Sequence, residues 1–194
     1  MKKGSGPKSS CFLLFAVIFI SALLSARNAS SLEAPKGKYI DKGACPFECC
    51  RYGPWKGRKT TTAYASPDAS SDLVGEYQSG TKVTALTGEV HTVPGRFIVK
   101  KAHARYKPGD VILVLTYLGE GHFKIWFDER MHIENLNFSP AGGSAGRRCE
   151  ATQYCWGELI GKLESSWWIK IKSADGWIGW TNQGENFDGQ DECG

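Results

Sequence analysis

The chain has 194 residues, of which 41% are hydrophobic, 23% charged and 12% aromatic; this composition excludes disordered and fibrous proteins and suits one domain or two small ones. Its formal net charge of +4 resides in residues 1–31, which hold four basic residues and no acidic one, so that 20 basic residues balance 20 acidic residues in the remainder. Charge therefore gives no support to nucleic acid as a partner.

Residues 1–31 have the layout of a secretory signal peptide. Lys2, Lys3 and Lys8 precede the apolar run 11–24, and small residues then lead to Ser31. A basic start, an apolar run of about 7–15 residues and a small-residue exit are typical of such a signal. We therefore predict an exported protein, periplasmic or extracellular, with no stable membrane span after signal removal. The alternative is an uncleaved anchor, although a span needs about 20 apolar residues.

Six cysteines follow this segment: Cys45, Cys49, Cys50, Cys149, Cys155 and Cys193. An even number in an exported chain indicates a disulfide framework. We expect Cys149 to pair with Cys155, and Cys193 to return to the first three, which would tie the termini onto the middle of the chain. Two alternatives stay open. One is a zinc site, for which no CxxC pair occurs, and the other is a catalytic thiolate at Cys49 or Cys50.

Short predicted strands separated by turns fill the chain from residue 59 onward. We expect residues 32–58 to be a linker and a cysteine-rich segment, and residues 59–194 to be a β domain. Strands are predicted at 59–64, 73–77, 82–86, 97–99, 111–118, 122–127, 167–172 and 177–181. No long helical stripe interrupts them. Regularly spaced short strands of this kind predict an all-β fold, either a small barrel or a sandwich.

Two blocks of the pattern resemble the bacterial SH3-like (SH3b) domain family. Residues 80–86, GTKVTAL, resemble the first half of an SH3-like repeat, and residues 167–181, with their Asp-Gly and Gly-Trp pairs, resemble the second half. The chain is thus similar to exported, cysteine-containing SH3-domain proteins of bacteria. The resemblance implies a small SH3-like barrel with a long β-rich insertion at about 89–166. Because residues 109–126 echo the same scheme, the insertion is alternatively a second SH3-like unit.

Alternation along the last two predicted strands separates core residues from surface residues. Ile169 and Ile171 share one face, which we assign to the core. Trp180 is assigned to the core as well, as a large buried aromatic side chain. Gly179, directly before it, is expected where a curved sheet needs a kink or a close backbone approach.

The same alternation suggests a ligand-binding surface. Trp168 and Trp177 point away from the aliphatic set, and Tyr64 begins the loop that flanks the groove in SH3-like domains. Trp and Tyr contribute strongly to binding, so we predict Tyr64, Trp168 and Trp177 as ligand-binding residues. The resemblance implies a cell-wall peptide or an envelope protein as the partner. The alternative is that these rings cover a second layer of the sheet.

Nothing in the sequence indicates catalysis, a metal or a cofactor. No HExxH, GxSxG, GxGxxG or P-loop pattern occurs. His132 and Glu134 would join a metal site only with ligands from elsewhere. The C-terminal carboxylates, Glu185, Asp188, Asp191 and Glu192, do not fit the EF-hand spacing. We therefore predict no catalytic residue, no bound metal and no cofactor.

The leading hypothesis is an exported, non-enzymatic binding or scaffolding module of the bacterial cell envelope. An envelope hydrolase or other enzyme is the first alternative. It would use the histidines and acidic residues of the insertion, and it requires them to meet in one cleft. A purely structural partner of an exported assembly is the second, and it would show a broad apolar patch.

Overall fold

The computed structural model describes Met1, residues 33–138 and residues 155–193. In this part of the chain the fold is all-β, as the sequence predicts, with one short 3-10 turn, η2 (Gly184–Asn186). No helix among the described residues is long and apolar enough to cross a membrane. The predicted signal peptide lies outside the described residues apart from Met1. Residues 33–194 form one compact unit, to which the description below refers.

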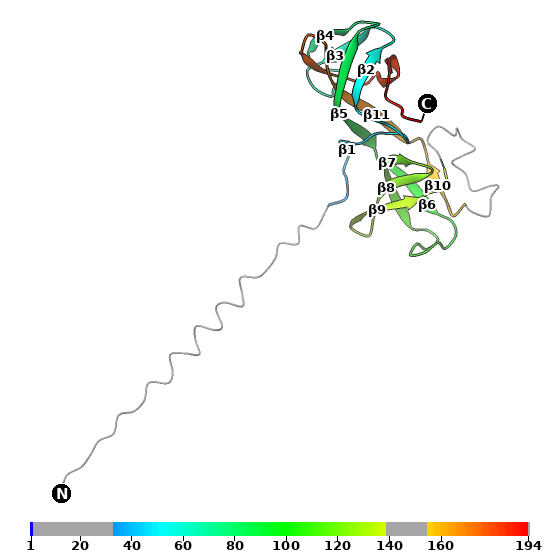
Figure 1. Cartoon of the computed structure of the whole chain (residues 1–194). Helices are drawn as coiled ribbons and strands as arrows, with labels where there is room; N and C mark the ends of the chain where they lie inside the picture. The colour runs from blue at the N-terminus through cyan, green and yellow to red at the C-terminus, as the bar shows by residue number, and fades with distance from the viewer. Residues whose placement is uncertain (2–32, 139–154, 194) are drawn as a thin grey trace. The chain divides into compact units, whose positions relative to one another are not determined.

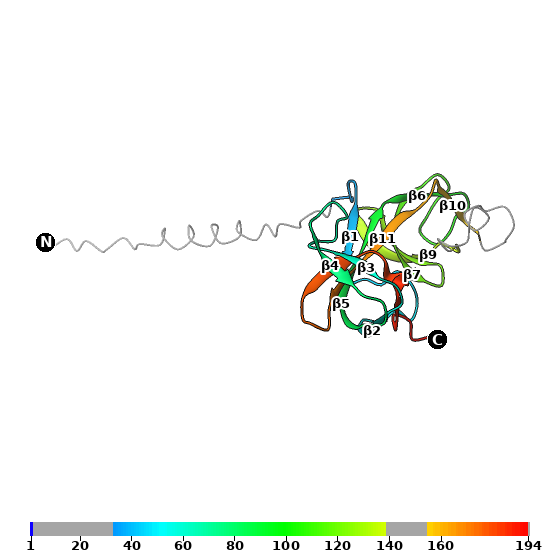
Figure 2. The ribbon, with the colours of Figure 1, turned by 90° about the horizontal axis from the view of Figure 1, so that it is seen from above.

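The first sheet has eight strands and curls around its own core. Its spatial order is β13 (Phe187–Asp188), β2 (Gly53–Gly57), β5 (Lys82–Val93), β11 (Glu164–Lys172), β12 (Ile178–Thr181), β3 (Thr61–Tyr64) and β4 (Leu73–Tyr77). Strand β1 (Tyr39–Lys42) shares an edge of β5 with β2, and Figures 1 and 2 show the curl from two sides. Strands β1 and β2 precede residue 59, so the segment 32–58 contributes to this sheet.

The core of the first sheet, which we call the first core, contains Trp55, Ala63, Tyr77, Val83, Ala85, Ile169, Ile171 and Phe187. Ile169 and Ile171 are fully buried, which confirms their predicted place. The prediction for Trp180 is wrong: its ring is only half-buried and lies 5.7 Å from the Lys170 ammonium. Trp180 pairs with Lys170 across the β11–β12 ladder, and directly paired residues share one face of a sheet, here the face opposite the two isoleucines.

Tyr77 connects three strands of this core. Its hydroxyl donates to the Ile171 carbonyl at 2.7 Å and accepts the Gly179 N–H at 3.1 Å. Burial raises the pKa of Tyr77, so the hydroxyl stays protonated and able to donate. An added Cβ at Gly179 would lie 2.8 Å from Val74 and 2.9 Å from Ala63, which confirms the predicted close approach.

The second sheet lies between β5 and β11 in the sequence. Its order is β10 (Gly157–Ile160), β6 (Gly95–Val99), β7 (Val111–Gly119), β8 (His122–Phe127) and β9 (Arg130–Asn135). Two-residue loops join β7 to β8 and β8 to β9, and both residues of each loop, 120–121 and 128–129, have positive φ. Positive φ at both loop residues is the signature of the type I′ turns that favour tight hairpins.

The second sheet has a hydrophobic core of its own. It contains Phe97, Val99, Tyr106, Ile112, Val114, Phe123, Ile125, Leu136, Phe138, Trp156, Leu159 and Leu163. The sheet falls within the predicted insertion at 89–166. However, β5 continues to Val93 and β11 starts at Glu164, so both ends of the predicted insertion belong to the first sheet.

Two disulfides join the N-terminal cysteine group to itself and to the C-terminus. Cys45 pairs with Cys50, and Cys49 pairs with Cys193, with Cα–Cα distances of 5.9 and 5.6 Å. The return of Cys193 to this group is confirmed. Cys155 is also disulfide-bonded, and its predicted partner Cys149 lies outside the described residues.

Replacing Tyr77 with Phe tests the hydrogen bonds at the first core. We expect Tyr77→Phe to lower the free energy of unfolding by about 1–3 kcal/mol, because buried groups on Ile171 and Gly179 lose their partner. Denaturant unfolding measures the change. Tyr64→Phe is the matched control, expected within about 0.5 kcal/mol, since no hydrogen bond of the Tyr64 hydroxyl occurs in the described part of the chain. Equal losses in both variants would contradict this account.

The two disulfides should contribute unequally to stability. They close sequence separations of 144 and 5 residues. Loop-closure entropy predicts a loss of about 5 kcal/mol for the Cys49→Ser, Cys193→Ser double variant and about 2 kcal/mol for Cys45→Ser, Cys50→Ser. Chemical unfolding of both double variants gives the order directly, and a larger loss from the short loop would refute it.

Candidate functional site

The predicted aromatic trio does not form one exposed surface. Tyr64 and Trp168 do meet, edge to face, with ring centroids 5.8 Å apart. However, Trp168 is only 5% exposed, so its predicted exposure is wrong: Tyr64 and His91 pack against it on the same face of the sheet. Trp177 lies elsewhere: it is half-buried, stacks on Tyr77 at 4.6 Å and packs against the core that contains Ile169 and Ile171, so its predicted direction away from them is wrong as well. These rings mainly cover the sheet, which is the alternative that the alternation left open.

The four histidines of the insertion occupy four different places. They are His91, beside Glu89; His103, stacked on Trp156; His122, next to the β7–β8 turn; and His132, in contact with Arg105. His91 is the buried one, with its Nε2 3.0 Å from the Glu89 carboxylate. The convergence in one cleft that a hydrolase would need is not found among these residues.

The cysteines proposed for a zinc site or a catalytic thiolate are in disulfide bonds in the structure. Cys49 and Cys50 are each bonded to another cysteine, which leaves neither as a thiolate or a zinc ligand. Within the described ranges, the one group with metal-site spacing is Cys49, Asp191 and Cys193, and its two sulfurs form the disulfide. Glu134 instead accepts hydrogen bonds from Arg105 and Tyr106, each at 2.7 Å.

An open groove of about 700 Å³ lies beside the loop that the disulfides constrain. One wall is this loop, residues 45–50, which we call the disulfide loop. The other wall is the turn between β7 and β8, with Leu118, Glu120 and His122, and it continues to Ile133 on β9. We call this hollow the disulfide groove; both of its walls come from segments outside the predicted aromatic trio.

A hydrogen bond connects the two walls of the groove. The Glu48 carboxylate accepts the N–H of Glu120 and packs directly over Gly119. Gly119 has φ of 105° and no room for a Cβ, because Glu48 occupies that space. Two features therefore require glycine at this position: the positive φ of the backbone and the contact with the disulfide loop.

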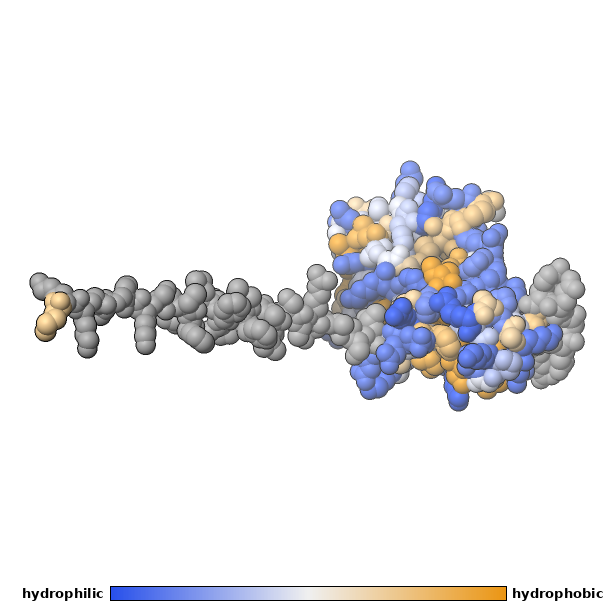
Figure 3. Space-filling model, turned by 90° about the horizontal axis from the view of Figure 1, so that it is seen from below, coloured by the Kyte–Doolittle hydropathy of each residue, from blue (hydrophilic) through white to orange (hydrophobic). Residues whose placement is uncertain are grey.

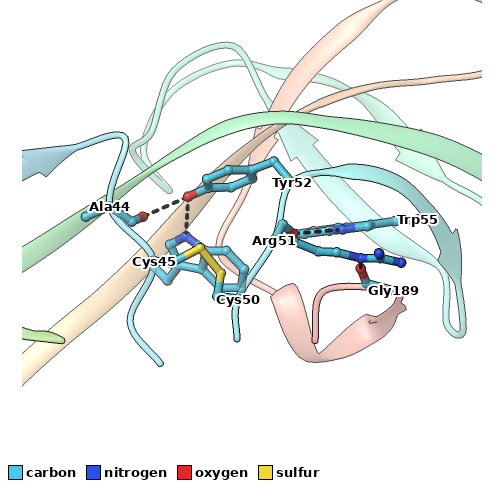
Figure 4. Close-up of a disulfide and its surroundings, with 8 residues drawn as sticks. Ala44, Cys45, Cys50, Arg51, Tyr52, Trp55 and Gly189 are labelled. Carbon is cyan, nitrogen blue, oxygen red and sulfur yellow. Dashed lines mark hydrogen bonds between the residues drawn. A yellow bond between two sulfur atoms is a disulfide. The ribbon is translucent and has the colours of Figure 1, made fainter. Parts of the chain in front are cut away.

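The disulfide loop is also attached to the first core. Phe47 packs edge to face on Trp167, with centroids 5.6 Å apart. The Trp167 indole donates to the Tyr52 hydroxyl at 3.3 Å. That hydroxyl donates in turn to the Ala44 carbonyl at 2.7 Å, as Figure 4 shows beside the Cys45–Cys50 bond. Burial raises the pKa of Tyr52, which keeps this hydroxyl a donor. Disulfides, ring packing and hydrogen bonds together hold the loop in one position.

The lining of the disulfide groove combines apolar and acidic groups. Phe47, Leu118 and Ile133 supply the apolar surface, and Ile133 is 61% exposed. Glu48 and Glu120 supply two exposed carboxylates, and the described lining contains no Lys or Arg. Such a surface is suited to an extended ligand that carries apolar groups and a positive charge.

Sequence reasoning did not select these residues. It identified residues 119–121 as a turn, but it offered no strand at 130–135 and hence no reason to regard Ile133 as an exposed apolar residue on a sheet edge. The available signal was the alternation after residue 127. No family model, curated protein or solved structure matches this chain.

Gly119→Ala tests whether the contact with Glu48 connects the two walls of the groove. The new Cβ would displace the Glu48 side chain, so we expect faster hydrogen exchange at the Glu120 amide and a lower free energy of unfolding. Gly109→Ala is the matched control, because Gly109 has a similar φ, 95°, and open space around a Cβ. Exchange at the Glu120 amide that is the same in both variants would contradict the contact.

Proposed function

We propose that this protein is an exported, non-enzymatic module of the bacterial cell envelope that binds an extended peptide in the disulfide groove. The observation that carries the proposal is a groove whose two walls are connected by disulfides, ring packing and the hydrogen bond from Glu120 to Glu48. Its volume falls in the usual range of about 300–1,000 Å³ for ligand sites. Both walls are held before a ligand arrives, and a preformed site loses little conformational entropy on binding.

The disulfides support export. Bonds of this kind persist in oxidising compartments such as the periplasm or the cell exterior. Cys45, Cys49, Cys50, Cys155 and Cys193 are all oxidised. The signal peptide proposed at residues 1–31 would deliver the chain to such a compartment, and the proposed SH3-like character of the first sheet agrees with a role at the cell wall.

Two features favour binding over the alternatives. The histidines of the described residues lie in four different places, so they do not meet in the one cleft that the hydrolase alternative requires. The face drawn in Figure 3 carries several apolar patches separated by hydrophilic side chains rather than one broad patch, which favours a local site over a large structural interface.

The groove chemistry narrows the class of peptide. Glu48 and Glu120 would attract an amino group or a guanidinium, while Phe47 and Ile133 would cover apolar groups beside it. A cell-wall peptide with a free amine and a basic segment of an envelope protein both offer this combination. The cell-wall peptide and the protein segment are both extended basic peptides, and this is the class of ligand proposed for the groove.

Binding to purified peptidoglycan and to synthetic Lys-containing peptides tests the proposal. We expect the oxidised protein from residue 32 onward to bind one of them, and the Glu48→Gln, Glu120→Gln double variant and Phe47→Ala to bind roughly tenfold more weakly, the effect of about 1.4 kcal/mol. Leu73→Ala is the matched control, since Leu73 is 67% exposed but lies on β4 of the first sheet. Unchanged binding by the groove variants would reject the site.

A further inference from the structure

Strand β9 is a free edge of the second sheet. It pairs with β8, and no other strand in the described ranges pairs with its opposite side. The two-residue loop before it makes Phe127 and Arg130 the hydrogen-bonded pair that closes the hairpin. Because hydrogen-bonded and non-hydrogen-bonded pairs alternate in an antiparallel ladder, Met131 and Ile133 turn their N–H and C=O groups outward.

The outward N–H and C=O groups of β9 are available for hydrogen bonds with another strand. The side chains of the same two residues, Met131 and Ile133, are unusual for the edge of a sheet. Apart from the ladder with β8, no backbone hydrogen bond of Met131 or Ile133 occurs in the described part of the chain, whereas the next outward carbonyl, Asn135, accepts the Trp156 indole at 3.2 Å. Met131 and Ile133 are 36% and 61% exposed. Proteins usually protect open edges with charged side chains, but both outward positions here are apolar.

Ile133 separates two hollows on one face of β9. On one side it lines the disulfide groove with Glu48 and Glu120. On the other side it lines a hollow of about 360 Å³ with Tyr39 and Met131. The first hollow is acidic. The second is mainly apolar, because its lysine, Lys124, is paired with Asp41 at 2.8 Å.

We propose that the peptide binds as an added β-strand along β9, with an apolar side chain in the Tyr39 hollow and a Lys or Arg side chain two residues away in the disulfide groove. This inference rests on the proposed function and names its binding mode. Side chains two residues apart on a strand project from the same face about 6.6–6.8 Å apart. Main-chain hydrogen bonds to Met131 and Ile133 supply affinity, and the two hollows select the side chains.

A basic peptide fits this edge better than a second copy of the chain. Antiparallel pairing of two β9 strands about His132 would place Met131 of each copy opposite Ile133 of the other. That arrangement brings no basic side chain to Glu48 and Glu120, because Arg130 lies on the opposite face from Ile133. The two carboxylates are better matched by a ligand that carries its own cation.

Selective N-methylation of a probe peptide tests strand addition. The probe is the blocked peptide Thr-Leu-Thr-Lys-Thr-Val, measured by calorimetry with the oxidised protein from residue 32 onward. In one version the amides of Leu, Lys and Val are methylated, and in the other those of the three Thr residues. Only alternate amides of an added strand face β9, so we expect one version to bind at least roughly tenfold more weakly and the other to keep its affinity.

A pair of protein variants provides the reciprocal test. Ile133→Pro removes an outward N–H without removing a hydrogen bond to β8, whereas Ile133→Ala removes only the side chain. We expect the proline variant to bind the probe roughly tenfold more weakly than the alanine variant. Thermal unfolding shows whether both variants fold; should the proline variant not fold, the methylated peptides decide.

The outcomes separate this inference from the proposed function. Equal affinity of the two methylated peptides, or binding of peptidoglycan without binding of the probe, would overturn strand addition and leave the disulfide groove as the site. A concentration-dependent dimer that excludes the probe would assign the edge to a second copy and overturn it too. Failure to bind either peptidoglycan or any Lys-containing peptide would overturn the proposed function itself.

Discussion

The pairing of β5 with β11 is the interaction on which the rest of the structure depends. The two strands pair from Val93 and Glu164 at one end to Thr84 and Lys172 at the other. The opposite edge of β5 is shared by β1 and β2, so this one strand pairs with three others of the first sheet. Because Val93 and Glu164 are partners, the chain leaves the first sheet for the second and comes back to it at one point. Closing such a long connection costs little more conformational entropy than closing a shorter one.

This arrangement explains why a groove forms where it does. The disulfide loop is attached to the first core through Trp167, a residue of β11, and to the C-terminus through Cys49 and Cys193. The β7–β8 turn comes from the second sheet and reaches the loop through Glu48. The groove is therefore a junction between two separately packed sheets, and each of its walls is connected to a sheet that has its own core.

The cysteines beside the candidate site could be predicted from the sequence, whereas the other residues of the site could not. The cysteines could be assigned from their even number and from the predicted export, since oxidation is a property of the compartment more than of the fold. The aromatic trio was misjudged because alternation tells which residues share a face but not whether that face is covered. Trp168 alternates as expected and is still buried, because Tyr64 and His91, from other strands, pack on it. Glu48, Glu120 and Ile133 come from three segments that only folding brings together.

The sequence by itself determined the all-β class, some of the turns such as the one at residues 119–121, the inward direction of Ile169 and Ile171, and the return of Cys193 to the N-terminal cysteines. These are local properties: strand periodicity, turn chemistry and cysteine count act over a few residues or follow from composition. Tertiary structure alone decided the pairing of β1 and β2 with β5, the orientation of Trp180, the burial of Trp168 and the free edge at β9. Each of these depends on which strand lies beside which, and that is set by pairing between residues far apart in the chain.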